Sequence, residues 1–207
     1  MIYDARKLLD DRGYTKTESI LNEWNYVKEW IGAEYAASKK AIKGLKGAAF
    51  SAATMCVSHN APLDMLMYYD ARPCGWNGMF NTDFVYEPLK GYFPFWMYNK
   101  LYLQDYSVFS ESLDKTVYAA AAGSENGNGA VMVTYFDDDA KEKNKIVEIA
   151  FNGIKGEKTL EFYLLDEDND ATLVKTEQIN NEISNIQLEM SLYSTYLIQI
   201  KDDELEK

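Results

Sequence analysis

The hydrophobic pattern of the chain changes once, near residues 104–106, and this change restricts the fold more than any other feature. Before it, helical runs alternate with short apolar runs that are typical of buried strands. After it, apolar residues recur at every second position in short segments separated by turn residues. In a chain of 207 residues, two such patterns predict two parts, residues 1–104 and residues 105–207. The expected fold class is α/β plus all-β.

The first part is predicted to alternate helices and strands. Helical runs are expected at residues 4–12, 33–45, 47–59 and 88–103, and strands at residues 19–22 and 63–69. The run 47–59 is small and apolar nearly all round, which predicts a helix packed on more than one side. Strands separated by helices pair in parallel through right-handed connections. In barrels built from such units, chemistry takes place at the carboxyl ends of the strands.

The second part is predicted to be an antiparallel β-sandwich. Its strands are expected at residues 108–110, 117–121, 131–136, 146–151, 160–165, 186–190 and 195–200. The glycine-rich segment 123–129 precedes a strand rather than a helix, so it indicates a hairpin turn and not a phosphate-binding loop.

Net charge and hydropathy narrow the choice of partners. The net charge of −12 would repel phosphate groups, which argues against nucleic acid and against an anionic membrane. No apolar run approaches the roughly 18 residues of a membrane span, and no signal peptide opens the chain. We therefore expect a soluble, cytoplasmic protein.

No metal or cofactor is expected. The chain has a single histidine, His59, which is predicted to end a helix, and two cysteines, Cys56 and Cys74, which are expected to be free thiols. The acidic run 166–170 lacks the glycine and the terminal glutamate of a calcium loop.

The segment 20–26 carries the strongest candidate for chemistry, the carboxylate of Glu23. Amides at Asn22 and Asn25 and aromatic rings at Trp24 and Tyr26 flank it. Amides suit sugar hydroxyls, and flat rings suit pyranose faces. A carboxylate at the end of a buried strand can attack an anomeric carbon. The alternative is that Glu23 makes only a salt bridge or hydrogen bond at a strand edge.

Three runs carry a resemblance to a known family: LNEWN at 21–25, GAAF at 47–50 leading to APLDMLMYYD at 61–70, and GWNGMF at 75–80 followed by KGYF at 90–93. In these runs the chain resembles the C-terminal part of the (β/α)₈ barrel of retaining glycosidases, and glycoside hydrolase family 39 most closely. Known members of that family act on xylosides and iduronides. The resemblance implies that the first part holds about two barrel strands, and that the second is the β-sandwich that follows the barrel.

The resemblance also implies roles for individual residues. Glu23 would be the nucleophile and Trp76 would stack on the sugar. The remaining residues expected to bind carbohydrate are Asn22, Trp24, Asn25, Tyr69 and Asp70. Retaining glycosidases also need a glutamic acid as acid/base, about 5–5.5 Å from the nucleophile, and it follows the fourth barrel strand. This chain is expected to contain only strands seven and eight. Because general acid catalysis contributes about 10²–10⁴-fold, we expect the chain alone to be inactive or nearly so.

Alternatives remain for Asp70 and for the whole chain. Asp70 could act as a catalytic partner of Glu23, but it is expected rather to bind a sugar hydroxyl or to fix the Arg72 loop. The chain could instead be a non-catalytic carbohydrate-binding or structural module, which its aromatic content of 14% favours. Against this, all four tryptophans precede residue 104. Exposed partial-barrel surfaces predict a homo-oligomer that buries helix 47–59 or a strand edge.

Overall fold

The computed structural model describes residues 2–72, 74–84, 87–154, 156–179 and 185–202. Its helices are α1 (Ile2–Asp10), α2 (Gly32–Ile42), α3 (Leu45–His59) and α4 (Phe93–Tyr102), and the short 3₁₀ turn η1 (Lys90–Tyr92) precedes α4. Its strands are β1 (Ile20–Trp24), β2 (Met65–Tyr68), β3 (Tyr106–Val108), β4 (Val117–Gly123), β5 (Gly129–Tyr135), β6 (Asn144–Ala150), β7 (Lys158–Leu165), β8 (Asp170–Ile179), β9 (Asn185–Ser191) and β10 (Thr195–Asp202).

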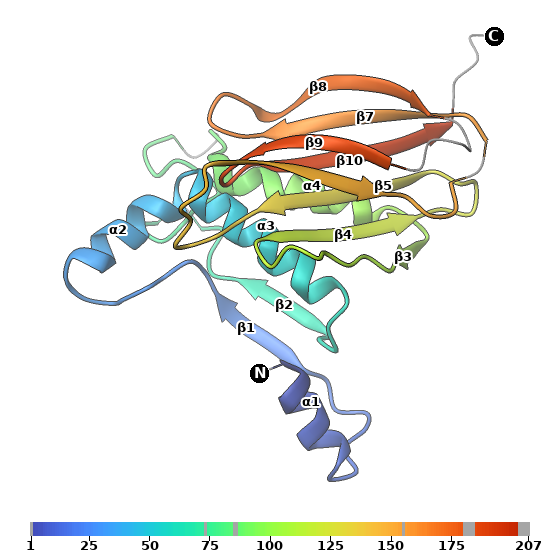
Figure 1. The fold of residues 1–207 in the computed structure, drawn as a ribbon. Coiled ribbons are helices and arrows are strands. Elements are labelled where there is room, and N and C mark those ends of the chain that lie inside the picture. Colours follow the sequence, from blue (N-terminus) through green and yellow to red (C-terminus); the bar gives the residue numbers. More distant parts are fainter. Residues whose placement is uncertain (1, 73, 85–86, 155, 180–184, 203–207) are drawn as a thin grey trace.

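Helices α3 and α4 lie between two sheets (Figure 1). On one side is the pair β1–β2, and on the other is a six-stranded antiparallel sheet of order β3-β4-β5-β10-β7-β8. The pair β6–β9 packs against the far face of the six-stranded sheet. The structure thus contains helices and antiparallel sheets in the order that the sequence predicts.

Strands β1 and β2 pair in parallel, which confirms the expectation for the first part. Ile20 lies opposite Met65, and Trp24 lies opposite Tyr68, so β1 uses one more residue than β2 over this distance. This extra residue forms a bulge between Leu21 and Trp24. Leu21 and Trp24 both pack on the helix side of the pair.

Helix α3 is covered on two sides, as its composition predicts. Ala48 and Ala52 are fully buried and pack against the six-stranded sheet and α4. Gly47 allows the tight corner between α2 and α3, because a Cβ atom there would lie 2.6 Å from Ile42 Cα. The chain itself therefore covers most of this helix, and Val57 is its exposed large side chain. Of the two surfaces expected to form a homo-oligomer, the strand edge is the more exposed, and the oligomer stays a prediction.

One hydrophobic core crosses the predicted boundary at residue 104. Ala120, Met132 and Leu197 of the six-stranded sheet belong to the same buried cluster as Met97 of α4 and Trp24. The opposite face of the sheet forms a second cluster with β6 and β9. The central strand β5 is consequently buried on both faces along its whole length.

Eight strands follow residue 104 in the described part of the chain, one more than predicted. The additional strand is β8, an edge strand whose side chains are mostly exposed and polar. Residues 123–129 form the expected hairpin turn, with Ser124 N donating to Asn128 O at 2.8 Å. His59 is the last residue of α3, and both cysteines are free thiols, as predicted.

The acidic run at 166–170 is the turn between β7 and β8. Asp166 Oδ1 accepts from the backbone of Asp168 and Asn169. The Lys90 ammonium donates to Asp166 O at 2.6 Å and pairs with Asp170 at 2.8 Å. A lysine of η1 therefore fastens this turn. Within the described residues, no three histidine, cysteine or acidic side chains are grouped as a metal site would require.

None of the helices in the described residues is long and apolar enough to pass through a membrane.

Candidate functional site

The carboxyl ends of β1 and β2 meet beside Glu23. Tyr69 N donates to Trp24 O at 3.0 Å and extends the pairing by one step. Asn22 and Glu23 are both exposed. Among the described residues, no group forms a hydrogen bond or ion pair with the Glu23 carboxylate. The structure thus leaves this carboxylate open to solvent and available for a ligand.

Asn25 ties three segments together just after β1. Its amide nitrogen donates to Tyr69 O at 2.6 Å and to Trp76 O at 3.0 Å. Its amide oxygen accepts from Tyr26 N at 2.7 Å. Both amide hydrogens are therefore used within the protein, and Asn25 places the Trp76 loop beside the strand ends.

The Tyr68 hydroxyl lies at the same junction, next to Asn25 and the Gly78 backbone. Burial raises the pKa of Tyr68 to about 12, although hydrogen bonds with Asn25 and the Gly78 backbone act in the opposite direction. Gly78 is needed here because a Cβ atom would lie 2.5 Å from Ile42 O and 2.7 Å from the Tyr68 hydroxyl. The Trp76 loop is thus held by close packing as well as by Asn25.

Asp70 binds its own loop. Its Oδ1 accepts from Arg72 N at 3.1 Å and from Cys74 Sγ at 3.4 Å. Its Oδ2 accepts from Arg72 Nε and Nη2 at 3.3 and 3.0 Å. The hydrogen bond and charge of Asp70 raise the pKa of Arg72. The peptide bond between Tyr69 and Asp70 is cis. The side chain of Asp70 is thus engaged by Arg72, whereas Tyr69 is 40% exposed.

Trp76 belongs to an aromatic cluster, defined here as Trp30, Tyr35 and Trp76. The Trp76 ring centroid lies 5.3 Å from that of Trp30 and 5.0 Å from that of Tyr35, with edge-to-face geometry in both pairs. Lys39 Nζ lies 5.5 Å from the Tyr35 centroid and 5.7 Å from the Trp76 centroid. Trp30 is 64% exposed and so offers a free indole surface beside the strand ends.

The sequence reasoning missed Trp30 and Tyr35 as members of this site. A signal was available, because both residues follow β1 and residues after parallel strands gather at one end of a sheet. Trp24, in contrast, is buried and packs against Tyr68 and Phe50, with centroids at 5.2 and 6.3 Å. The structure therefore places Trp24 in the core, and leaves Asn22, Glu23, Tyr69 and the aromatic cluster at the surface.

Comparison with solved structures places this geometry in a known fold. A monomeric β-xylosidase from Caulobacter crescentus CB15 superposes on 98% of the chain with a TM-score of 0.70 and 10% identity, over 49% of its own length. The GH39 enzyme from Xanthomonas axonopodis pv. citri matches 97% of the chain with a TM-score of 0.68 and 8% identity, over 48% of its length. A glucosidase from Croceicoccus marinus matches 97% with a TM-score of 0.66 and 14% identity, over 49% of its length.

The chain shares its fold with glycoside hydrolases. The resemblance that the sequence suggested is thereby confirmed at the level of the fold. The chain spans about half the length of these three proteins. No protein-family model matches the chain, and no curated protein is significantly similar to it in sequence.

Proposed function

We propose that the chain is the C-terminal portion of the catalytic unit of a retaining glycoside hydrolase, with Glu23 as its nucleophile. In this proposal β1 and β2 are the seventh and eighth strands of a (β/α)₈ barrel, and the antiparallel sheets are the β-sandwich that follows it. The observation that carries the proposal is the exposed, unpaired Glu23 carboxylate at the end of a parallel strand pair, in a fold shared with glycoside hydrolases.

The chemistry assigned to Glu23 is attack on the anomeric carbon. A carboxylate oxygen forms the new bond as the glycosidic oxygen leaves, and water later cleaves the glycosyl ester. The leaving oxygen needs a proton from a second carboxyl group about 5–5.5 Å from Glu23. Asp70 is a poor candidate for that role because Arg72 keeps its carboxylate in an ion pair. The donor would therefore lie on strands that complete the barrel.

Additional strands have an open surface to occupy. Ile20, Met65 and Met67 are each more than 40% exposed on the β1–β2 pair, and within the described residues these two strands pair only with each other. Exposed apolar side chains and unpaired strand edges favour further pairing. A second copy of the chain could use the same edges, and light scattering that shows a monodisperse monomer would count against such a homo-oligomer.

Sugar contacts are assigned to the side chains that the structure leaves free. Asn22 and Tyr69 would bind hydroxyl groups, and Trp76 and Trp30 would stack on sugar rings. Asn25 and Asp70 would not contact the sugar, but would hold in place the loops beside it. Trp24 would likewise support β1 from the core. The proposed carbohydrate ligand thus lies across the ends of β1 and β2.

Covalent labelling tests the role of Glu23 without needing a proton donor. A 2,4-dinitrophenyl 2-deoxy-2-fluoro-β-xyloside carries a leaving group that departs unprotonated, so a nucleophile alone can trap the sugar. We expect mass spectrometry to find slow labelling of the peptide that contains Glu23, and no labelling of the Glu23→Gln variant. Glu29→Gln, in the exposed loop after β1, should label like the wild type. Labelling that persists in Glu23→Gln would refute the assignment.

Turnover tests the expected inactivity. With a 4-nitrophenyl β-xyloside, the purified chain should release nitrophenol at or near the rate of buffer. Rapid release that Glu23→Gln abolishes would show that the chain needs no further proton donor.

A binding role without hydrolysis is the second candidate, and the exposed Trp30 beside Trp76 favours it. Quenching of tryptophan fluorescence by xylohexaose, with no labelling of Glu23, would support this function instead.

A further inference from the structure

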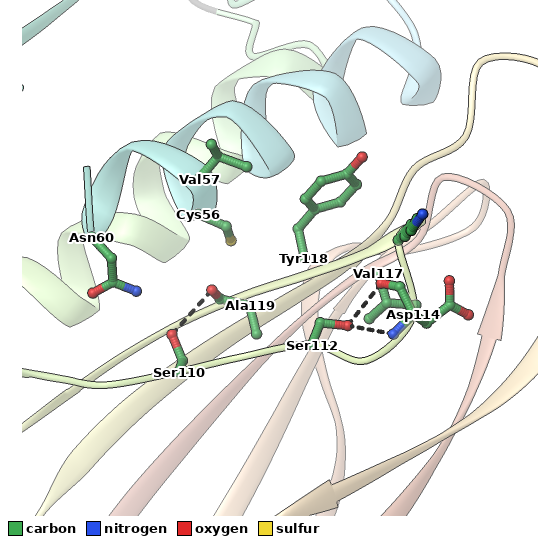
Figure 2. Close-up of a pocket in the computed structure, with 10 residues that line it drawn as sticks. Cys56, Val57, Asn60, Ser110, Ser112, Asp114, Val117, Tyr118 and Ala119 are labelled. Carbon is green, nitrogen blue, oxygen red and sulfur yellow. Dashed lines mark hydrogen bonds between the residues drawn. The ribbon is translucent and has the colours of Figure 1, made fainter. Parts of the chain in front are cut away.

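A hollow lies along the carboxyl-terminal end of α3, away from Glu23. Figure 2 shows it between that helix and the segment 109–116, which joins β3 to β4. The end of α3 leads into the amino end of β2, whereas Glu23 lies at the opposite, carboxyl end of the strand pair. The hollow has a volume of about 250 Å³. At ~30 Å³ each, it would hold roughly eight water molecules that a ligand could displace.

The lining of this hollow, called here the α3 groove, combines apolar surface with uncharged polar groups. The Tyr118 ring and the side chain of Val57 supply the apolar surface. The amide of Asn60 supplies donors and an acceptor on one side. On the other side the hydroxyls of Ser110 and Ser112 supply acceptors, because Ser110 donates its hydrogen to Ala119 O and Ser112 donates its hydrogen to Asp114 O. Such a mixture suits a ligand that has both C–H faces and hydroxyl groups.

Several of these polar groups are free to bind. Among the described residues, no side chain or backbone group hydrogen-bonds to the Asn60 amide or the Tyr118 hydroxyl. Ser110 Oγ donates to Ala119 O at 3.2 Å, and this leaves its oxygen able to accept. Burial raises the pKa of Tyr118, so its hydroxyl remains a donor at neutral pH.

The charges at the groove do not favour an ionic ligand. The Asp114 carboxylate is bound by Lys145 at 2.7 Å and by Thr116 at 2.7 Å. Lys115 is a single exposed cation at the rim, and the net charge of the chain is −12. For a phosphorylated or polyanionic ligand, Lys115 would be the available cation, since Lys145 is paired with Asp114. The net negative charge of the chain would repel such a ligand.

We propose that the α3 groove is a second carbohydrate-binding site, which holds one or two units of a neutral oligosaccharide against Tyr118, Asn60 and Ser112. The choice of a sugar rests on the proposed function, whereas the site itself is separate from Glu23. A chain of sugars bound there would keep a polymeric substrate attached to the protein independently of the strand ends.

Chemical-shift mapping of the full 207-residue chain tests this site. Xylohexaose and cellohexaose are titrated into ¹⁵N-labelled protein, and backbone signals of Asn60, Ser110 and Ser112 are followed together with the indole signals of Trp30 and Trp76. We expect saturable shifts at the groove with at least one of the two sugars. Absence of saturable groove shifts with both sugars would overturn the proposal.

Two variants test whether the side chains of the groove themselves bind the sugar. In Asn60→Ala/Ser112→Ala, half-saturation of the Ser110 signal should need at least fivefold more sugar, while the Trp30 and Trp76 responses stay unchanged. Tyr118→Phe keeps the ring and should weaken binding less than the double variant does. Unchanged groove affinity in the double variant would refute the assignment. The indole signals of Trp30 and Trp76 report on the strand ends. Saturable shifts at the groove without any shift of these indole signals would reject the proposed function and leave this inference standing.

Discussion

The Tyr26 hydroxyl donates a hydrogen bond of 2.5 Å to Asp138 Oδ1, a residue 112 positions further along the chain. Lys28 and Lys46 pair with the same carboxylate at 2.7 and 2.5 Å. Tyr26 follows β1, Lys46 is in α3 and Asp138 follows β5, so this cluster connects the strand pair, the helices and the six-stranded sheet. Its tyrosine follows β1, the strand that carries Glu23, by two residues.

Replacing Tyr26 by Phe should destabilise the protein by about 1–2 kcal/mol, because a hydrogen bond to a charged group is lost while the ring remains. Urea unfolding followed by circular dichroism measures the change. Tyr102→Phe is the matched control, since Tyr102 is 79% exposed, and it should alter the free energy of unfolding by less than about 0.5 kcal/mol. Equal effects of the two substitutions would contradict the role of Tyr26.

Acid should weaken this connection in a defined range of pH. Burial alone would raise the pKa of Asp138, but hydrogen bonds from Lys28, Lys46 and Tyr26 lower it to about 2. A carboxylate whose folded pKa lies below its ordinary value of 3.8 stabilises the protein above that value and loses its effect as the pH falls through about 2. Asp138→Asn should therefore be less stable than the wild type by about 1–2 kcal/mol at pH 7, and nearly equal to it at pH 2.

The pH comparison uses urea midpoints of both proteins at pH 7, 4 and 2. The pKa of Asp114 is also lowered to about 2, chiefly by hydrogen bonds from Lys145 and Thr116, so the wild type loses stability from two carboxylates over the same range. Asp114→Asn should show the same convergence but a smaller gap at pH 7, because its carboxylate is 47% exposed. A gap between wild type and Asp138→Asn that stays constant with pH would contradict the electrostatic explanation.

The sequence predicted the parallel pair β1–β2 and the buried helix α3, because apolar runs between turn residues leave few other folds. It did not predict that Trp24 enters the core. Simple alternation along β1 would set Trp24 on the side opposite Leu21, but the bulge between them returns Trp24 to the helix side. The sequence did not predict strand β8, because its side chains are mostly exposed and polar and therefore show no apolar alternation.

The site was predicted only in part, since its arrangement depends on contacts between distant residues. Glu23 and Trp76 stand out by residue type and position. The hydrogen bonds from Asn25 to residues 44 and 51 positions away, and the ion pair that engages Asp70, depend on how the loops fold back. Such pairings leave no period or spacing in the sequence.

Gly78→Ala should destabilise the protein by about 1–3 kcal/mol, because the added methyl group would meet backbone at 2.5 Å that cannot move aside. It should also loosen the Trp76 loop and change the tryptophan fluorescence. Gly75→Ala is the control within the same loop, since its methyl group would meet only the flexible end of Lys39 at 3.1 Å. Thermal unfolding measures the loss of stability in both variants. A loss in Gly75→Ala as large as that in Gly78→Ala would contradict the packing argument.

The two thiols should differ sharply in reactivity. Burial raises the pKa of Cys56, which is 3% exposed, whereas Cys74 lies in the partly exposed loop beside Asp70. We expect a thiol reagent such as dithionitrobenzoate to modify one cysteine in the folded protein and two in urea. Cys74→Ser should abolish the reaction of the folded protein, and two equivalents of rapid reaction without denaturant would contradict the buried position of Cys56.

The bulge in β1 has a consequence for how sequence change can act on this strand. A regular strand exposes every second side chain on one face, but the extra residue allows two neighbours, Asn22 and Glu23, to be exposed together. Deletion of either Asn22 or Glu23 would restore simple alternation with the Trp24 indole still on the helix side, and would leave one exposed side chain where two now lie next to each other. The extra residue is therefore what places an amide and a carboxylate side by side at this strand end.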